Sequence, residues 1–164
     1  MSSRLKKSSL EPIFLKTASS LKIGIAVSES HPEVTEELFE GAVNTLITNG
    51  IRRENIIRKN VPGSFELPLA AQILLKKNKT SAVICLGCVI KGETDHYNYI
   101  CSAVSKGIMD VSLSHNKPVA FGVLTTDTLD QAINRAARMN PLGIGKLSNK
   151  GEEAALSVLK MLAK

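Results

Sequence analysis

The chain has 164 residues, 43% of them hydrophobic, and it contains three cysteines. That length is enough for one substantial core but not for two ordinary domains, and an odd number of cysteines does not indicate a disulfide framework. The formal net charge is +6, yet residues 1–22 hold five basic residues and one acidic residue and so account for +4 of it. Because tryptophan is absent and only 4% of the residues are aromatic, the composition argues against a nucleic-acid-binding surface.

The start of the chain differs in composition from the rest. Residues 1–21 are rich in serine and in basic residues, which predicts a flexible N-terminal arm; an organelle transit peptide is the alternative. This arm lacks the apolar centre of a secretory signal, and no apolar run approaches the roughly 20 residues of a membrane-spanning helix. We therefore expect a cytoplasmic protein with no membrane partner, whose single folded domain comprises residues 22–164.

Strand and helix patterns alternate along the predicted domain. Short apolar runs predict strands at residues 22–28, 56–61, 81–86 and 119–124. Apolar residues at helical spacing predict helices at residues 34–47, 66–77, 95–117, 128–138 and 151–163, the last capped by Ser148 or Asn149. This order predicts an α/β fold, a flavodoxin-like three-layer sandwich whose four-stranded parallel sheet carries helices on both faces.

Ligands of such sheets bind beyond the carboxyl ends of the strands, so the loops that leave the strands are candidate sites. After the second predicted strand, Pro62 and Gly63 predict a tight turn that exposes the amide of Ser64 and directs Glu66 toward this edge. A carboxylate there could hold a polyhydroxyl chain. A helix N-terminal acid is the alternative role for Glu66.

The segment 87–96 joins the third predicted strand to the longest predicted helix. Gly92 lets a ligand approach the backbone, the amides around Glu93 and Thr94 are left unpaired by the helix geometry, and His96 stands in the first turn. This pattern favours an anion site beside an imidazole that transfers protons. The alternative is a capped helix, with Thr94 or Asp95 at the N-cap and His96 on the surface.

Neither a metal nor a bound cofactor is expected. Cys85 and Cys88 lie three apart in or next to a strand, so their side chains point to opposite faces, and no helix starts at the second of them as a redox motif requires. His31, His96 and His115 show no ligand spacing, and the sequence contains no GxGxxG motif or P-loop. A flavin-binding or signalling domain of flavodoxin type is disfavoured, because no acidic receiver cluster is present.

Four motifs follow one another along this predicted ligand edge: Val-Pro-Gly-Ser-Phe-Glu-Leu-Pro at 61–68, Gly-Glu-Thr-Asp-His-Tyr at 92–97, Phe-Gly-Val-Leu-Thr-Thr-Asp at 121–127 and Asn-Lys-Gly at 149–151. Together they resemble the lumazine synthase family over residues 22–164. The resemblance implies a cofactor-free condensation of 5-amino-6-(D-ribitylamino)uracil with 3,4-dihydroxy-2-butanone 4-phosphate. The product is 6,7-dimethyl-8-ribityllumazine, the riboflavin precursor.

The resemblance also implies roles for individual residues. His96 would act as general acid and base, and Arg135 would bind the phosphate together with the turn formed by Gly92, Glu93 and Thr94. Arg138, one turn further on, is the alternative to Arg135. The remaining substrate contacts would come from Ser30, His31, Ser64, Phe65, Glu66, Val89, Ile90, Phe121 and Lys150. Of these, Ser64 and Glu66 would hold the ribityl chain, while Val89 and Ile90 would line the heterocycle.

In this family the counterparts of Phe121, Arg135 and Lys150 reach the site from a neighbouring subunit, so the resemblance implies that a homopentamer is the smallest active unit. It also makes riboflavin synthase a candidate partner. Residues 139–147 form a longer connection than usual, and their Pro and Gly residues predict a loop. We expect this loop to stop assembly at the pentamer rather than at an icosahedral shell. A decamer of two facing pentamers is the alternative.

The segment after the first strand departs from the family pattern. Relatives usually carry Phe or Trp followed by Asn, whereas this chain has Ser30 and His31. The aromatic platform for the heterocycle is therefore missing, unless the ring of His31 replaces it. This difference raises the alternative of a diverged, non-catalytic paralogue that binds a lumazine or a flavin. Retention of the acid, histidine, arginine and lysine of the site favours the enzyme.

Overall fold

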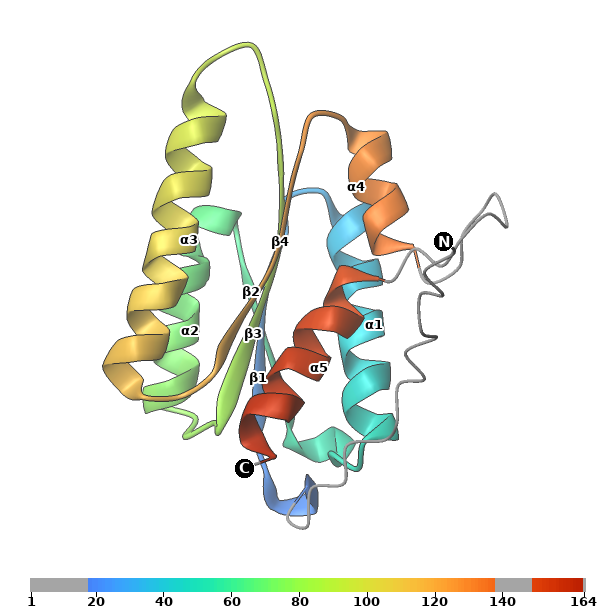
Figure 1. Cartoon of the computed structure of the whole chain (residues 1–164), viewed down its shortest axis with the longest axis vertical. Coiled ribbons are helices and arrows are strands. Elements are labelled where there is room, and N and C mark those ends of the chain that lie inside the picture. The colour runs from blue at the N-terminus through green and yellow to red at the C-terminus, as the bar shows by residue number, and fades with distance from the viewer. Residues whose placement is uncertain (1–17, 138–148, 164) are drawn as a thin grey trace, which may run out of the picture.

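The computed structural model of the chain describes residues 18–137 and 149–163, and its centre is one parallel β-sheet. The strands are β1 (Ile23–Ser28), β2 (Ile56–Val61), β3 (Ala82–Ile90) and β4 (Val119–Thr126). Their order across the sheet is β2-β1-β3-β4, and every neighbouring pair is parallel (Figure 1). After β2 the chain therefore crosses to the other side of β1, where β3 and then β4 are added to the sheet.

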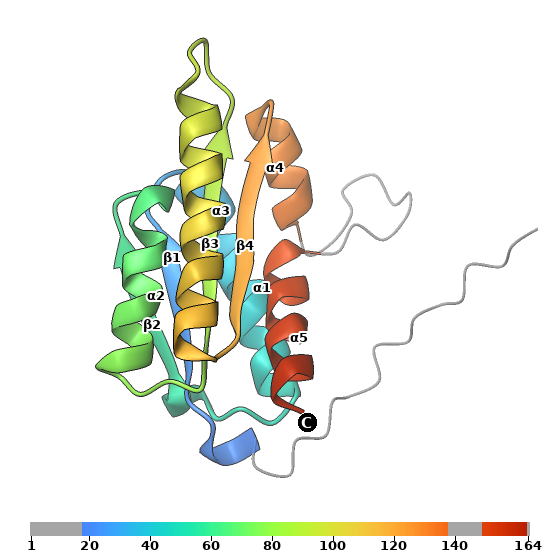
Figure 2. The same cartoon turned by 60° about the vertical axis from the view of Figure 1, so that its left-hand side comes forward.

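Helices cover both faces of this sheet. They are α1 (Pro32–Thr48), α2 (Leu67–Lys76), α3 (His96–His115), α4 (Leu129–Ala136) and α5 (Lys150–Leu162). Three short 3-10 helices complete the described elements: Ala18–Ser20, Arg53–Asn55 and Ser64–Glu66. Helices α2 and α3 lie on one face and α1, α4 and α5 on the other (Figure 1), while Figure 2 shows α3 running along β3 and β4. The predicted flavodoxin-like sandwich is confirmed.

Alternation along the strands produces two separate cores. Ile84 and Cys88 of β3 pack with α1, α4 and α5, whereas Val83 and Cys85 of the same strand pack with α2 and α3. The two cysteines thus point to opposite faces, as predicted, and the helix that follows begins only at His96.

Local sequence explains where the helices begin and end. The predicted cap Asn149 accepts hydrogen bonds from the amides of Gly151 and Glu152, which starts α5. Thr128 caps α4 in the same way, by accepting from the amide of Gln131 at 3.2 Å. At the end of α3, His115 lies in the last turn as expected. The other predicted cap of α5, Ser148, lies outside the described residues.

Two strands are longer than the apolar runs predict. Residues 87–90 of β3 pair with residues 123–126 of β4, so the loop before α3 spans only residues 91–95. Gly87 belongs to the strand rather than to a turn. A Cβ at this position would lie 2.5 Å from the hydroxyl of Ser64, so this glycine allows a close approach to the neighbouring loop.

The predicted N-terminal arm falls mainly on residues 1–17, outside the described part. Its last residues contact the body: the carbonyl of Ser19 accepts hydrogen bonds from Arg52 Nε and Asn55 Nδ2, each at 2.8 Å, and Ala18 is buried. The boundary after residue 21 stays a prediction. Among the helices described, none has the length and apolar character needed to cross a membrane.

Candidate active site

A pocket of about 250 Å³ opens at the carboxyl ends of β1 and β3. Here the chain leaves neighbouring strands in opposite directions, which is where ligands bind in open α/β sheets. We call it the histidine pocket. It is lined by Ser30, His31, Gly63, Ser64, Phe65, Cys88, Val89, Ile90, His96 and Ile100.

The loop after β1 is tied to the loop after β2. Ser30 Oγ donates to the carbonyl of Pro62 at 3.1 Å, and the amide of Ser30 donates to Ser28 Oγ at 3.2 Å. His31 is the N-cap of α1 and has a left-handed backbone with φ of 56°, which is uncommon for a residue other than glycine. Its Nδ1 lies 3.6 Å from a carboxylate oxygen of Glu33. The first loop therefore presents an imidazole to the pocket in a defined backbone conformation.

The turn after β2 presents a buried hydroxyl to the same pocket. Ser64 is 5% exposed, and its Oγ hydrogen-bonds to no group among the described residues. An unpaired buried hydroxyl is costly unless a ligand or water completes it. Glu66 Oε2 accepts from the amide of Gly63 at 2.9 Å, so its carboxylate holds the turn in the helix N-terminal role. Its contact with a ribityl chain stays a prediction.

The first turn of α3 carries His96, which is exposed and lines the pocket. Asp95 is the N-cap of the helix, but its side chain accepts from none of the helix amides. Gly92, Glu93 and Thr94 are exposed on the loop before it, beside the pocket rather than in its lining. A Cβ at Gly92 would meet no atom within 4 Å, so the loop backbone is open to an approaching ligand.

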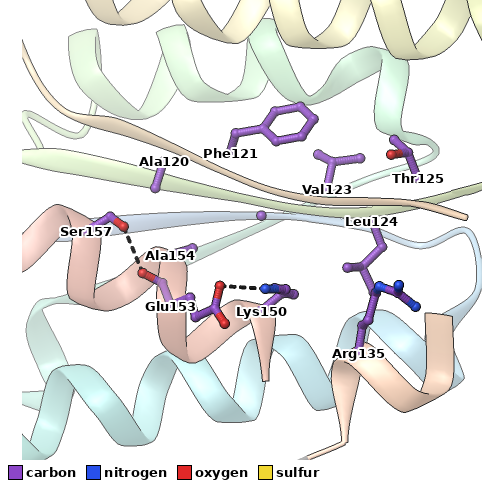
Figure 3. A pocket seen from close by; sticks show the side chains of 11 residues that line it. Ala120, Phe121, Val123, Leu124, Thr125, Arg135, Lys150, Glu153, Ala154 and Ser157 are labelled. Carbon is purple, nitrogen blue, oxygen red and sulfur yellow. Dashed lines mark hydrogen bonds and ion pairs between the residues drawn. The ribbon is translucent and has the colours of Figure 1, made fainter. Parts of the chain in front are cut away.

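A second pocket, of about 390 Å³, lies along the edge strand β4 between it and helices α4 and α5 (Figure 3). We call it the arginine pocket. It is lined by residues 120–125 of β4 together with Arg135, Lys150, Glu153, Ala154 and Ser157. In Figure 3, Phe121 and Thr125 point from one face of the strand, while Arg135 and Lys150 approach from the other.

The charges of the arginine pocket suit an anion. Arg135 donates to the carbonyl of Gln131 at 3.2 Å, and no carboxylate of the described residues lies within ion-pair distance of its guanidinium. Lys150 Nζ lies 2.7 Å from Glu153 Oε2. Two cations therefore face one carboxylate, which leaves a net positive pocket whose guanidinium has no carboxylate partner among the described residues.

The predicted site residues do not all line one pocket. Seven of them line the histidine pocket: Ser30, His31, Ser64, Phe65, Val89, Ile90 and His96. Phe121, Arg135 and Lys150 line the arginine pocket, and the two linings share no residue. The remaining four, Glu66, Gly92, Glu93 and Thr94, are in neither lining. Arg138 lies outside the described residues. A single chain thus separates the predicted general acid and base from the predicted phosphate-binding arginine.

Sequence reasoning missed lining residues in both pockets. Ile100 stands four residues after His96 and Glu153 three residues after Lys150, spacings that put each pair on one side of a helix. Helical periodicity could have found them.

Cys88 lines the histidine pocket, but its burial makes it a poor nucleophile. Desolvation raises the pKa of the Cys88 thiol to about 11 and that of Cys85 to about 12. Both are therefore protonated thiols at neutral pH. Within the described residues, no group of three or more His, Cys, Asp or Glu side chains is arranged to hold a metal ion. The polar groups of the two pockets are instead suited to proton transfer and anion binding.

Comparison with known proteins shows what this chain is similar to. The family model described as 6,7-dimethyl-8-ribityllumazine synthase matches residues 20–164. A protein of that name from Cytophaga hutchinsonii is 57% identical over 145 residues, 88% of this chain and 87% of the relative. Proteins of the same name from Parabacteroides distasonis and Porphyromonas gingivalis are each 46% identical, over 88% and 86% of this chain and 86% and 83% of their own lengths.

Each of these relatives carries the name of the enzyme, so the matches give no support to a non-catalytic paralogue. The family match spans both pockets and all four motifs, and it leaves out only the first 19 residues. The chain therefore belongs to the 6,7-dimethyl-8-ribityllumazine synthase family, which confirms the riboflavin-pathway condensation, and hence the transferase, that its motifs predicted.

Proposed function

We propose that the histidine pocket of one chain and the arginine pocket of a neighbouring chain together form the site that condenses 5-amino-6-(D-ribitylamino)uracil with 3,4-dihydroxy-2-butanone 4-phosphate. The separation of the two linings carries this proposal. A proton-transfer group without its phosphate group is half of a site, and a second copy of the chain supplies the other half.

The histidine pocket would take the pyrimidine. The unpaired hydroxyl of Ser64 and the carboxylate of Glu66 offer hydrogen bonds to the ribityl chain, and Val89 and Ile90 at the end of β3 provide an apolar wall for the heterocycle. His31 and Ser30 lie at the same wall, where relatives usually carry an aromatic residue. Phe65 extends the apolar surface outward, since it is 57% exposed.

The reaction needs proton transfers at several atoms. The amine of the pyrimidine attacks the ketone carbon, and water leaves as the imine forms. A proton is then removed from the neighbouring carbon as the bond to the phosphate oxygen breaks, and the second amine closes the ring with loss of another water. His96, exposed to the pocket at the first turn of α3, would accept and return these protons.

The phosphate would lie between two subunits. The guanidinium of Arg135, which has no carboxylate partner among the described residues, can bind two phosphate oxygens. The open backbone from Gly92 to Thr94, just ahead of α3, would supply amide donors from the other subunit. Lys150 would add a second positive charge, already balanced in part by Glu153.

Exposed apolar side chains beside each pocket support such a contact. Phe65 is 57% exposed at the histidine pocket, Leu69 at the start of α2 is 61% exposed, and Phe121 is 45% exposed at the arginine pocket. Tyr99, Met109 and Leu113 add exposed apolar surface along α3. Two different surfaces that meet repeatedly generate a ring when the rotation between neighbouring subunits closes, and the family resemblance gives five subunits for this ring.

The same proposal covers the assembly beyond the ring. Residues 139–147 lie outside the described residues, and their extra length is the reason to expect free pentamers, with a decamer as the alternative. Light scattering should give the mass of five subunits. A sixty-subunit particle would contradict this expectation, whereas a shell that forms only after the loop is shortened would support it. Riboflavin synthase as partner and the cytoplasmic location also remain predictions.

A turnover assay with both substrates tests the function. The enzyme should form one lumazine and release one phosphate for each pyrimidine consumed, without any added cofactor. A protein that bound the pyrimidine or the lumazine but released no phosphate would instead be the non-catalytic paralogue.

A further inference from the structure

Asn149 joins three helices through one fully buried side chain. It is 0% exposed. Its Oδ1 accepts from the amides of Gly151 at 2.7 Å and Glu152 at 3.1 Å, and its Nδ2 donates to the carbonyl of Glu37 at 2.9 Å and to that of Ala136. Both amide hydrogens and both lone pairs of the oxygen are therefore in use, in a residue that sits directly before Lys150.

The surroundings are shaped to admit this side chain. A Cβ at Gly41 of α1 would lie 2.5 Å from Asn149 Oδ1, and a Cβ at Gly151 would lie 1.9 Å from the carbonyl oxygen of Leu38. Helices α1 and α5 thus approach so closely that only glycine fits at both contacts. The asparagine side chain is held in a narrow slot, where a shifted α4 or α5 would break its hydrogen bonds.

The partners of Asn149 lie next to the two cations of the arginine pocket. Ala136, whose carbonyl accepts from Nδ2, follows Arg135 at the end of α4. Lys150 follows Asn149 at the start of α5. The chain between Arg135 and Lys150 runs through fourteen residues, 136–149, so their separation is not set by sequence proximity. Asn149 links the end of α4, the start of α5 and α1 across this interval.

Helix capping alone does not require an asparagine here. Serine or aspartate caps a helix about as well, through an oxygen that accepts from the first amides. The two N–H donors of Asn149 add nothing to the cap, and they reach instead to α1 and to the end of α4. The amides of Gly151 and Glu152 already donate to Oδ1, so they are not available to an anion in the pocket. Such an anion is bound by side chains instead.

We propose that Asn149 is a positioning residue, which holds Arg135 and Lys150 at a fixed separation for the phosphate of the substrate whatever the length of the connection between them. This inference rests on the proposed function, because it takes Arg135 to bind the phosphate. It predicts that loss of the bridging N–H groups impairs phosphate binding in particular, and leaves the histidine pocket intact.

Asn149→Ser tests this, since it keeps an oxygen for the cap and removes the bridge. The KM for the butanone phosphate should rise about tenfold or more, while kcat and the KM for the pyrimidine change little. Thr128→Ala is the matched control, because it removes the cap at the other end of α4 without touching the bridge. It should leave the KM for the phosphate substrate nearly unchanged.

A double-mutant cycle with Arg135→Ala separates positioning from general damage. In the Arg135→Ala background, Asn149→Ser should raise the KM for the phosphate substrate no further. An equal rise in both backgrounds, or an equal loss in all kinetic constants, would overturn the positioning role and leave the proposed function standing. If Arg135→Ala alone left that KM unchanged, the proposed phosphate site would fail and this inference with it. Should Asn149→Ser not fold, Asn149→Gly, which is tolerated at a helix N-cap and leaves no buried polar side-chain atom unpaired, takes its place in the same cycle with the same outcomes.

Discussion

His96 is the imidazole of the histidine pocket with the freest access to a substrate. It lies in the first turn of α3 and is exposed, so a substrate can reach it without rearrangement of the helix. Among the ion pairs of the described residues, none joins the His96 ring to a carboxylate. The role that we propose for His96 is proton transfer, which adds to the rate gained by bringing the two substrates together.

Removal of this imidazole should slow turnover moderately. His96→Ala should lower kcat by about 10²-fold or less, because positioning of the substrates supplies much of the rate. Steady-state kinetics with both substrates saturating measure the effect. His115→Ala, at the far end of the same helix, is the control and should leave kcat unchanged. Unaltered kcat in the His96 variant would remove His96 from the mechanism.

We expect Ser30 to stand where the family usually has an aromatic ring, and a substitution tests this. Ser30→Trp should tighten binding of the pyrimidine by roughly 5- to 150-fold, if stacking is worth about 1–3 kcal/mol as for bases on aromatic side chains. The bond from Ser30 Oγ to the Pro62 carbonyl is lost in this variant, which reduces the gain. Calorimetry with the pyrimidine, and with inorganic phosphate as the unaffected reference ligand, measures it.

His31→Ala decides whether an imidazole already serves as the platform. If it does, His31→Ala should weaken pyrimidine binding strongly and Ser30→Trp should gain little. If it does not, His31→Ala should have a small effect. Two variants with wild-type affinity would mean that the loop after β1 does not contact the heterocycle, and that our alignment of this loop is wrong.

At the scale of the elements, apolar periodicity was sufficient to predict the four strands and five α-helices described, but not the three short 3-10 helices. The ends of β3 and β4 were not predictable in this way. A glycine such as Gly87 usually indicates a turn, and only its close contact with Ser64 explains why it lies within a strand. The pairing of residues 87–90 with β4 is a property of two strands together. The apolar pattern of one strand does not reveal how far it pairs with its neighbour.

The site shows the same limit. Motifs identified its residues, yet the spacing of His96 and Arg135 along the chain does not reveal that they line different pockets. The separation follows from the strand order, which puts β4 at the edge of the sheet. The bridge made by Asn149 was likewise visible only as a helix cap, because its other partners lie on α1 and α4.

The buried thiol of β3 should make stability depend on alkaline pH. Burial raises the pKa of Cys85 from 9.0 to about 12, so the folded state keeps a proton that the unfolded state loses above pH 9. The stabilisation is complete below that value and is lost as the pH rises toward 12. Between pH 8 and pH 10 the free energy of unfolding should fall by about 1 kcal/mol more for the wild type than for Cys85→Ala.

Urea denaturation at one protein concentration gives both pH slopes. Cys101→Ala is the matched control, since this thiol on α3 is only partly buried, and its slope should lie closer to the wild type. Equal slopes for the wild type and Cys85→Ala would mean that the thiol ionises as easily in the folded protein as in the unfolded chain.

At the scale of the whole molecule, the two pockets make activity a property of neighbouring chains. Oligomers co-expressed from His96→Ala and Arg135→Ala subunits should recover activity, because some contacts join an intact histidine pocket to an intact arginine pocket. Random assembly from equal amounts makes about one quarter of the contacts intact. The assay compares the mixture with each variant alone, after mass spectrometry has verified mixed oligomers.

A second mixture serves as the control for this experiment. His96→Ala and Glu66→Ala affect the same pocket, so no contact regains both groups and activity should equal the average of the two variants. Absence of recovery in the first mixture would place all the catalytic groups on one chain, contrary to the proposed site.

The free thiols of Cys85 and Cys88 can also be used to measure local opening of the structure. One thiol is covered by α2 and α3, and the other lies on the opposite face of the same strand, beneath α1 and beside the histidine pocket. An alkylating reagent reaches the sulfur of Cys85 only when α2 or α3 moves away from the sheet, whereas it approaches Cys88 from the histidine pocket. The two alkylation rates, read by mass spectrometry in a single sample, therefore compare opening of the α2–α3 layer with access to the histidine pocket, without any label introduced into the chain.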